Sequence, residues 1–494
     1  MSRQPLRSRG FVAIPAILAL VAACSGTTAT PVPVVQPTPQ VINATPQVIN
    51  ATPQVINATP QVITITPAPE SAAPTTSAGV CTSADQAKAD GKTPIEIDSW
   101  WTTGGESTGF NLLLDAFNTA NPTLCAYNAA IAGGAGTVAQ GRIKAAVLAG
   151  LPPDSFQVHM GHELLDTYVN IKGGSVMNPL GSDVLDPSKF PADVVKIISG
   201  TDGKVYSVPL NIHRANVLWY NKTVLTANGI ANPPTTWAEF KTDADILKAA
   251  GITPIAVGDG GGIWPTGMLF ETALIGELGA DGFSGLWTGA TKWDSPKVTA
   301  ALNDLALIVG YEDAGAAGSE TWDQAADDVI SGKAAMTIMG DWANGEFQNK
   351  KFTDYGWAAA PGNTKIYQAL ADSFGLPAKA TDQDATKKLL AYMATAEGQD
   401  IFNPYKGSIP ARIDAGNPPA TGAQYTDYQL SAIKDWTATD TLHVPSMEHG
   451  AAANPAWKSA IEDALTAFVA KADAAGVTAA QTALVDAASQ FVTK

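Results

Sequence analysis

Two adjacent tryptophans end an apolar, strand-forming run in the stretch IDSWWTTGGES. Tryptophan offers a large flat face that can pack against a ring. Side chains alternate across a strand, so Trp100 and Trp101 cannot both enter the same core. By alternation after Ile97 and Ser99, we expect Trp101 to face outward and contact a ligand. Trp100 would then either pack into the fold or line the far side of a cleft.

A second set of polar side chains ends another strand-like run, SFQVHM. Gln157 and His159 share one face of this strand, because they alternate with its apolar residues. Their donors and acceptors suit recognition of hydroxyl groups, although a solvated face of an edge strand would carry the same residues. A zinc site at His159 and His162 is not expected, since the chain holds only 5 histidines and no cysteine is free to join them. No metal, cofactor or catalytic residue is predicted.

These side chains need a scaffold that brings strand ends together, and the sequence alternates strand-like with helix-like runs. Apolar residues recur at helical spacing from Phe110 to Phe117, and Pro122 stops the predicted helix. Such a βαβ succession predicts an α/β fold with a mostly parallel, doubly wound sheet, in which ligands bind beyond the carboxyl ends of the strands. The predicted strands are 95–100, 125–131 and 155–160, and a second helix runs through 143–149 after a glycine-rich turn at 133–136.

The composition is that of a globular protein. Of the 494 residues 45% are hydrophobic, which is enough for two or three domain-sized cores. The formal net charge is -16, and loss of the first 23 residues, whose charged groups are all basic, would make it more negative. Nucleic acid and anionic membrane surfaces are therefore poor partners.

The first 23 residues are expected to be a secretory signal, because arginines precede an apolar run that is shorter than a membrane span. The sequence LVAAC resembles the bacterial lipobox, in which cleavage leaves Cys24 as a lipidated N-terminus. Cleavage of an ordinary signal peptide near Ala23 would instead release a soluble protein. No later run is long and apolar enough to span a membrane, so lipid would be the only anchor.

Residues 24–80 are rich in threonine and proline, and they contain three copies of TPQVINA followed by a degraded fourth. The prolines rule out a coiled coil, so we predict an extended spacer. Once Cys24 carries lipid, Cys81 and Cys125 remain as an even pair in an oxidising compartment. We predict one disulfide between them, which would tie the lead-in segment to the first domain; two buried free thiols are the alternative.

Eight motifs give the chain a family resemblance, and together they cover nearly everything from Ile95 to the C-terminus. In their types and order they resemble the glucose/mannose-type extracellular solute-binding proteins (family 1) of bacterial ABC sugar importers. The motifs are IDSWWTTGGES, PPDSFQVHMG, GKVYSVPLNIHRANVLWYNK, PPTTWAEF, GKAAMTIMGDWANGEF, LADSFGLP, EGQDIFNPYKGSIPAR and MEHGA.

The resemblance implies a periplasmic-binding-protein-like fold, in which two α/β lobes with doubly wound sheets are joined by a three-segment hinge. The three crossings are expected near 208–212, 368–373 and 408–412. Lobe 1 would comprise residues 93–210, completed by about 370–410, and lobe 2 residues 211–369, completed by about 411–494.

The same resemblance implies that a monosaccharide, namely glucose, mannose or galactose, binds between the lobes and is delivered to the permease subunits of an ABC transporter. The protein would be a monomer, lipid-anchored at the cell surface or on the periplasmic side of the cytoplasmic membrane. By motif position, the residues expected to contact the sugar are Trp100, Trp101, Glu106, Gln157, His159, Trp322, Trp342, Asp372, Lys406 and His449.

A secreted glycoside hydrolase is the alternative, with Glu106 and Asp372 as the pair of carboxyl groups that would flank the scissile bond. Lys406 and two histidines in the same site argue against it, because they favour two ionised carboxylates and leave no general acid. A surface adhesin held on the Thr/Pro segment would explain the anchor but not the clustered aromatic and acidic motifs. We therefore expect a binding protein rather than an enzyme.

Overall fold

The computed structural model describes residues 81–133, 136–416, 418–419, 422 and 424–492. The predicted signal peptide, the lipidation at Cys24 and the repeat-containing spacer lie outside these residues. Among the described helices, none has the length and hydropathy that a membrane span requires.

A six-stranded sheet carries the N-terminal part of the described chain. Its strand order is β2-β1-β3-β12-β4, and β5 pairs with β12 outside this path. The strands are β1 (Thr93–Ser99), β2 (Leu124–Ala130), β3 (Ser155–His159), β4 (Met177–Asn178), β5 (Ser207–Pro209) and β12 (Asp372–Pro377). β1 pairs in parallel with both β2 and β3, which confirms the predicted parallel arrangement for the first βαβ units. β12 arrives from much later in the chain and runs antiparallel to β3.

Two four-stranded sheets of mixed direction follow, with the orders β10-β7-β9-β8 and β13-β6-β11-β14. The parallel pairs in them are β8 with β9 and β11 with β14. The strands of the first are β7 (Val217–Asn221), β8 (Thr253–Ile255), β9 (Ala334–Met339) and β10 (Tyr355–Ala359). The strands of the second are β6 (Asn211–Arg214), β11 (Ile366–Leu370), β13 (Ile409–Pro410) and β14 (Leu442–Pro445).

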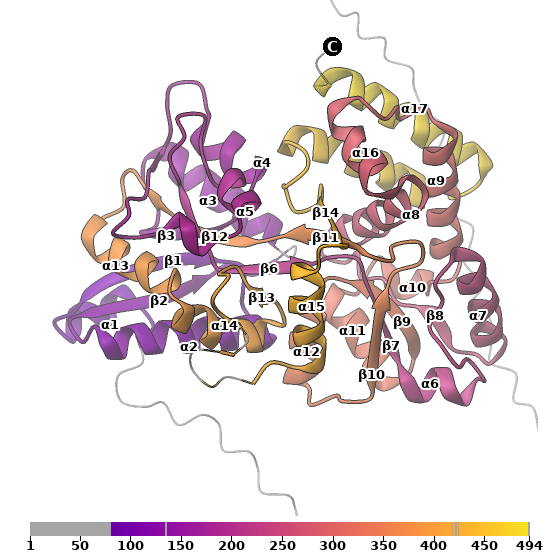
Figure 1. Ribbon diagram of the computed structural model, residues 1–494, viewed down its shortest axis with the longest axis horizontal. Helices are drawn as coiled ribbons and strands as arrows, with labels where there is room; N and C mark the ends of the chain where they lie inside the picture. The colour runs from indigo at the N-terminus through magenta and orange to yellow at the C-terminus, as the bar shows by residue number, and fades with distance from the viewer. Residues whose placement is uncertain (1–80, 134–135, 417, 420–421, 423, 493–494) are drawn as a thin grey trace, which may run out of the picture. The chain divides into compact units, whose positions relative to one another are not determined.

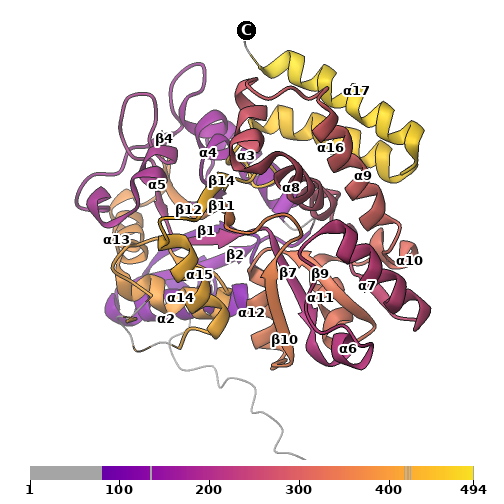
Figure 2. The same cartoon turned by 45° about the vertical axis from the view of Figure 1, so that its right-hand side comes forward.

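Figures 1 and 2 show the helices in two views. Those up to residue 249 are α1 (Ala84–Ala89), α2 (Gly104–Ala120), α3 (Thr137–Ala149), α4 (His162–Leu164), a π-helical turn (Leu165–Val169), a 3-10 turn (Pro187–Lys189), α5 (Ala192–Ile197), α6 (Lys222–Ala227) and α7 (Trp237–Ala249). The later ones are α8 (Trp264–Thr288), α9 (Pro296–Val309), α10 (Ala314–Ala317), α11 (Trp322–Ser331), α12 (Trp342–Asn349), α13 (Gln383–Met393), α14 (Ala396–Lys406), α15 (Asp427–Thr437), α16 (Pro455–Val469) and α17 (Ala474–Phe491).

The chain passes between the sheets at short, buried segments. It leaves the six-stranded sheet after β5, turns at Leu210 and enters β6 of a different sheet. It returns where β11 is followed by Ala371 and then by β12. After α14, which packs on α2, strand β13 pairs with β6. The chain therefore changes sheets at Leu210 and at Ala371, and β13 rejoins the sheet that contains β6.

Helix α2 shows why this region folds as the sequence predicts. The helix runs from Gly104 to Ala120, and its C-cap Asn121 directly precedes the proline. It buries Phe110 and Phe117 together with the two leucines between them, as its apolar spacing requires. The predicted disulfide joins Cys81 to Cys125, whose Cα atoms lie 5.4 Å apart, and it ties the segment before α1 to β2.

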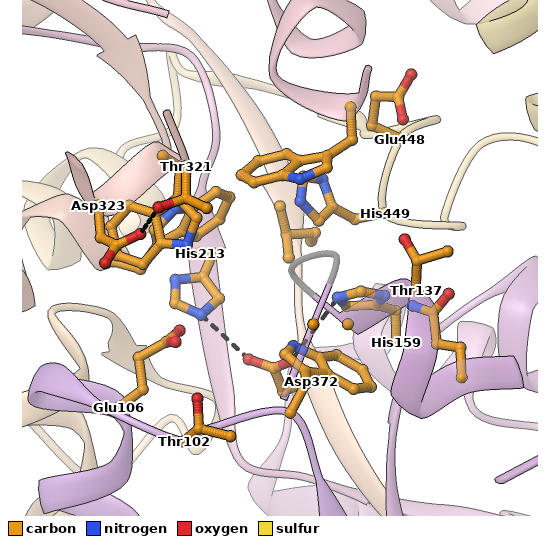
Figure 3. A pocket seen from close by; sticks show the side chains of 18 of the residues that line it. Thr102, Glu106, Thr137, His159, His213, Thr321, Asp323, Asp372, Glu448 and His449 are labelled. Atoms are coloured by element: carbon orange, nitrogen blue, oxygen red, sulfur yellow. Dashed lines mark hydrogen bonds and ion pairs between the residues drawn. The ribbon is translucent and has the colours of Figure 1, made fainter. Parts of the chain in front are cut away.

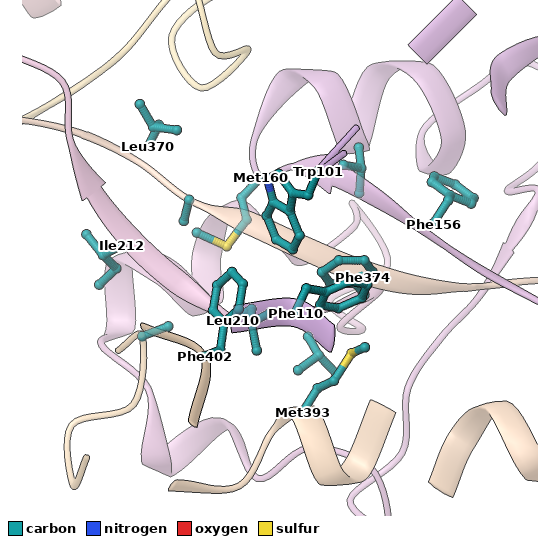
Figure 4. Close-up of a cluster of buried hydrophobic side chains, with 14 of the residues drawn as sticks. Trp101, Phe110, Phe156, Met160, Leu210, Ile212, Leu370, Phe374, Met393 and Phe402 are labelled. Atoms are coloured by element: carbon teal, nitrogen blue, oxygen red, sulfur yellow. The ribbon is translucent and has the colours of Figure 1, made fainter. Parts of the chain in front are cut away.

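Two large clusters of buried apolar residues stabilise the described chain. One includes Ile95, Ile97 and Phe156 of the six-stranded sheet, together with Phe110 and Phe402 of the helices that cover it. Figure 4 shows the centre of this cluster, with Trp101 among the phenylalanines. The other cluster joins α8, α9, α16 and α17, which the two ribbon views show packed together.

Candidate functional site

A cavity of about 290 Å³ opens where the strand ends of the six-stranded sheet meet the crossing strands and the N-termini of later helices. Figure 3 shows its side chains pointing inward from segments that lie far apart in the sequence. We call it the pocket. It is lined by Trp100, Thr102, Thr103, Glu106, Gly133, Gly136, Thr137, Gln140, His159, His213, Trp264, Thr321, Trp322, Asp323, Trp342, Leu370, Asp372, Lys406, Glu448, His449 and Lys458.

Trp100 forms one wall of the pocket directly after β1. Its backbone N–H donates to Oε1 of Gln157 (3.1 Å), and its ring centroid lies 5.0 Å from that of His159. Gly136 lies against the indole, so closely that a Cβ atom there would stand 3.1 Å from a ring carbon. Gly136 also has φ 108°, a backbone conformation that favours glycine. The backbone of Gly136, directly before α3, thus limits where the Trp100 indole can lie.

Asp372 lies at the centre of a buried hydrogen-bond network where β12 begins. Its Oδ1 accepts from Nε2 of Gln157 (2.8 Å), and its Oδ2 accepts from Nδ2 of Asn211 (2.9 Å). His213 Nε2 lies 3.1 Å from the same Oδ2. Burial by itself would raise the pKa of Asp372, but the hydrogen bond from His213 and the charge of Lys406 outweigh it and hold the pKa well below its usual range. Asp372 is therefore ionised and available as a hydrogen-bond acceptor.

His213, which lies on β6, has an aspartate side chain at each of its two ring nitrogens. Its Nδ1 contacts Asp341 and its Nε2 contacts Asp372, and all three side chains are buried. Burial lowers the pKa of His213, but the Asp341 and Asp372 carboxylates together outweigh this effect and the net pKa is raised. Its contacts with both carboxylates hold the Asp372 carboxylate in one orientation.

Lys406, the last residue of α14, is one of two lysines that line the pocket. It is 3% exposed and forms an ion pair with Glu106 of α2. Its ammonium group also lies 5.3 Å from the ring centroid of Trp101 and 5.7 Å from that of Trp342, which is within the range of a cation–π contact. The pocket thus combines a donor, Lys406, with two carboxylate acceptors, Glu106 and Asp372.

Aromatic side chains from the later part of the chain also line the pocket. The ring of Trp342 lies 6.1 Å from that of Trp264, 6.5 Å from that of Trp322 and 5.2 Å from that of His449, measured between centroids. His449 also stands 5.3 Å from His159, which comes from the six-stranded sheet. The pocket therefore brings the flat apolar faces of indole rings together with charged and polar groups.

The structure contradicts the prediction that Trp101 faces the ligand. Trp101 is 0% exposed and packs against Phe110, Phe374 and Phe402 at centroid distances of 4.9 to 5.7 Å. Alternation correctly groups Trp101 with Ile97, but that face of β1 is the core face. Trp100, just beyond the end of the strand, is the tryptophan that lines the pocket.

The structure also places Gln157 behind the pocket rather than in it. Gln157 is 1% exposed and is not one of the lining residues, because both ends of its amide are used inside the protein. Its Oε1 accepts from the Trp100 backbone and its Nε2 donates to Asp372. Gln157 therefore positions two lining residues instead of contacting a ligand itself.

The other residues predicted for the site come together in the pocket. They are Trp100, Glu106, His159, Trp322, Trp342, Asp372, Lys406 and His449. Sequence reasoning did not include His213, Trp264, Thr137, Gln140, Glu448 or Lys458 among the predicted contacts. Two signals were present: His213 follows the first crossing, and Thr137 and Gln140 open a helix directly after a glycine-rich turn.

Comparison with known families gives one match that spans more than half of the chain. Residues 129–400 match the family described as bacterial extracellular solute-binding protein. An uncharacterized ABC transporter extracellular-binding protein of Pyrococcus horikoshii is 35% identical over 384 residues, which cover 77% of this chain and 84% of that protein.

A probable sugar-binding periplasmic protein of Mesorhizobium japonicum is 31% identical over 389 residues, covering 76% of this chain and 88% of that protein. Among solved structures, a bacterial solute receptor described as having an exclusive preference for β-D-galactopyranose superimposes with a TM-score of 0.70 at 22% identity. The superposition covers 82% of this chain and all of that one. At this level of identity the superposition establishes a shared two-lobe fold.

Proposed function

Because the chain belongs to the family of bacterial extracellular solute-binding proteins, we propose that it captures a monosaccharide (glucose, mannose or galactose) in the pocket and delivers it to the permease of an ABC importer. The name of the Mesorhizobium relative supports a sugar as the ligand. Members of the family bind solutes and are not enzymes, so the hydrolase alternative has no support from the comparisons.

One observation carries the proposal: the pocket is lined both by indole rings and by ionised hydrogen-bonding groups. A pyranose has apolar faces of C–H groups and a rim of hydroxyls, so it needs both kinds of surface. Trp100, Trp322 and Trp342 supply plates, while Asp372 accepts and Lys406 donates. Hydrogen bonds to ionised groups are roughly twice as strong as neutral ones, and the low dielectric of a buried pocket strengthens them further.

The size of the pocket supports a monosaccharide. Ligand cavities generally range from about 300 to 1,000 Å³, and about 290 Å³ lies at the lower end of that range. The charge pattern also argues against hydrolysis. Glu106 is paired with Lys406, and the pKa of Asp372 is held well below its usual range, so neither carboxyl group is set up as a general acid.

We propose that the segments at Leu210, Ala371 and Ser408 act as the hinge and that the sugar stabilises a closed state. Trp100 and His159 belong to the six-stranded sheet, whereas Trp322, Trp342 and His449 come from the parts of the chain beyond the crossings. A ligand that contacts both sets favours the conformation in which both contacts exist. The proposed anchor is lipidated Cys24, and the proposed assembly is a monomer.

The test is isothermal titration of the secreted chain with D-glucose, D-mannose and D-galactose, with tryptophan fluorescence as a second signal. We expect saturable binding of at least one of these sugars and no release of reducing sugar from di- or oligosaccharides. Failure to bind any of them, or sustained hydrolysis, contradicts the proposal. For the anchor, Cys24→Ala is expected to move the protein from the membrane fraction to the soluble fraction.

A further inference from the structure

The loop that contains His449 is hydrogen-bonded to a buried glutamate of α8. Glu271 of α8 is 0% exposed. Its Oε1 accepts from the backbone N–H of Met447, and its Oε2 accepts from the hydroxyl of Ser446 (3.0 Å). Glu271 lies outside the pocket, and none of the predicted motifs includes it. The carboxylate therefore organises the turn from Ser446 to His449 from behind.

Ser446 connects this carboxylate to the imidazole of His449. Its Oγ lies 3.1 Å from Nδ1 of His449 and also accepts from the backbone N–H of that residue (3.3 Å). A serine hydroxyl has a single proton. If Ser446 donates that proton to Glu271, its oxygen can only accept from His449, and Nδ1 must then carry a hydrogen.

We infer that Glu271, acting through Ser446, holds His449 in the Nδ1–H tautomer, so that the Nε2 lone pair accepts a hydrogen bond from a ligand hydroxyl. Glu271 is thus a positioning residue for the pocket. The part of the inference that concerns the ligand rests on the proposed function, whereas the tautomer is a property of the protein alone. A ligand without a hydroxyl donor at this point would leave Nε2 unpaired in a buried site.

The surroundings of His449 agree with a neutral imidazole. Burial lowers the pKa of His449 well below its ordinary value, and the nearby His159 and Lys458 act in the same direction. Within the described part of the chain, no hydrogen bond to Nε2 accompanies those to the rest of the residue. The ring lies among Trp264, Trp342 and His159, which line the pocket with it.

The relay requires an ionised Glu271. Burial raises the pKa of Glu271 to about 7, against the hydrogen bonds from Met447 and Ser446 that lower it. The other titratable groups in the turn that Glu271 contacts are His449 and the buried Glu448 carboxyl, which is paired with Lys458. At pH 8 Glu271 is predominantly ionised, so that pH suits a test.

The test is NMR of the ligand-free protein, labelled with ¹⁵N and ¹³C only at its 5 histidines, at pH 8. The ring nitrogens of His449, assigned by loss of their signals in His449→Gln, should show a protonated Nδ1 and an unprotonated Nε2. In Glu271→Gln the amide oxygen would accept from Met447 and the amide group would donate to Ser446. The serine would then donate to Nδ1, and the imidazole should switch to the Nε2–H tautomer.

The functional arm measures affinity for D-glucose, D-mannose and D-galactose by calorimetry. Glu271→Gln is expected to weaken binding at least tenfold, whereas Asp304→Asn, which removes a partly buried carboxyl of α9 outside the pocket, should stay within twofold. If Glu271→Gln does not fold, Ser446→Ala removes the same relay and should abolish the preference for Nδ1–H.

Two results would overturn the inference: a wild-type His449 that is an imidazolium or carries its proton on Nε2, or a Glu271→Gln variant in which Nδ1 stays protonated. If none of the three sugars binds the wild-type protein, the proposed function fails, but the tautomer measurement still decides whether the relay exists.

Discussion

The sharpest test of the pocket compares alanine substitutions at the two adjacent tryptophans, Trp100 and Trp101. Trp101 is fully buried among Phe110, Phe374 and Phe402, so Trp101→Ala leaves a large cavity in the core. Truncation of a buried tryptophan typically costs about 3 to 5 kcal/mol of unfolding free energy. The indole N–H of Trp101 has no hydrogen-bond partner among the described residues, so little polar compensation is lost with it.

Trp100→Ala should have the opposite profile. Trp100 is only partly buried and lines the pocket, so its removal should cost about 1 kcal/mol of stability or less. Loss of a central aromatic contact typically reduces binding by about 1 to 3 kcal/mol, which corresponds to an increase in Kd of about 5- to 150-fold. Trp101→Ala should change Kd by less than tenfold, through the weaker support that it leaves for Lys406.

The assay combines urea unfolding with calorimetric titration of whichever of the three sugars binds the wild-type protein. Trp237→Ala is a matched control, because Trp237 is also buried and its indole N–H has no partner in the described part of the chain, but it lies on α7, outside the pocket. It should lose stability and keep its affinity. The reasoning is refuted if Trp101→Ala keeps its stability and loses binding while Trp100→Ala does the reverse.

Three further predictions follow from the charges and cross-links. Lys406→Met should raise Kd at least 100-fold, because it leaves the partly buried Glu106 without its cation; unchanged affinity by calorimetry would contradict this. Replacing Cys81 and Cys125 together by serine should lower the unfolding free energy by about 3 to 4 kcal/mol in urea titrations, and an unchanged midpoint would show that the disulfide does not stabilise the fold. Burial and the neighbouring Glu277 raise the pKa of Asp304 to about 7. The folded protein therefore binds a proton at Asp304 more tightly than the unfolded chain does, and its unfolding free energy falls as the pH rises through 7. Asp304→Asn should therefore be about 1 to 2 kcal/mol more stable than the wild type at pH 8, after allowance for partial exposure, and this gain should shrink toward pH 4.

The sequence was sufficient to predict those features whose determining residues lie close together along the chain. The apolar spacing from Phe110 to Phe117 predicted α2, and the proline at 122 predicted its end within a residue or two. The βαβ succession predicted the parallel pairing of β1 with β2 and β3. Cysteine parity predicted the bond between Cys81 and Cys125. Eight of the ten residues expected from motif positions line one pocket, and their contact with a sugar stays a prediction.

What the sequence determined by itself was therefore the set of elements and the relative faces of neighbouring side chains. A period of two shows that Trp100 and Trp101 point apart, but it does not say which face meets the core, because that depends on what packs there. Only the tertiary structure brought Phe374 and Phe402 onto Trp101. It also paired both ends of the Gln157 amide with groups inside the protein, and it placed Glu271 behind His449. Hydrogen bonds and packing between residues more than a hundred positions apart arise from the folded arrangement of the sheets, and local periodicity carries no information about them.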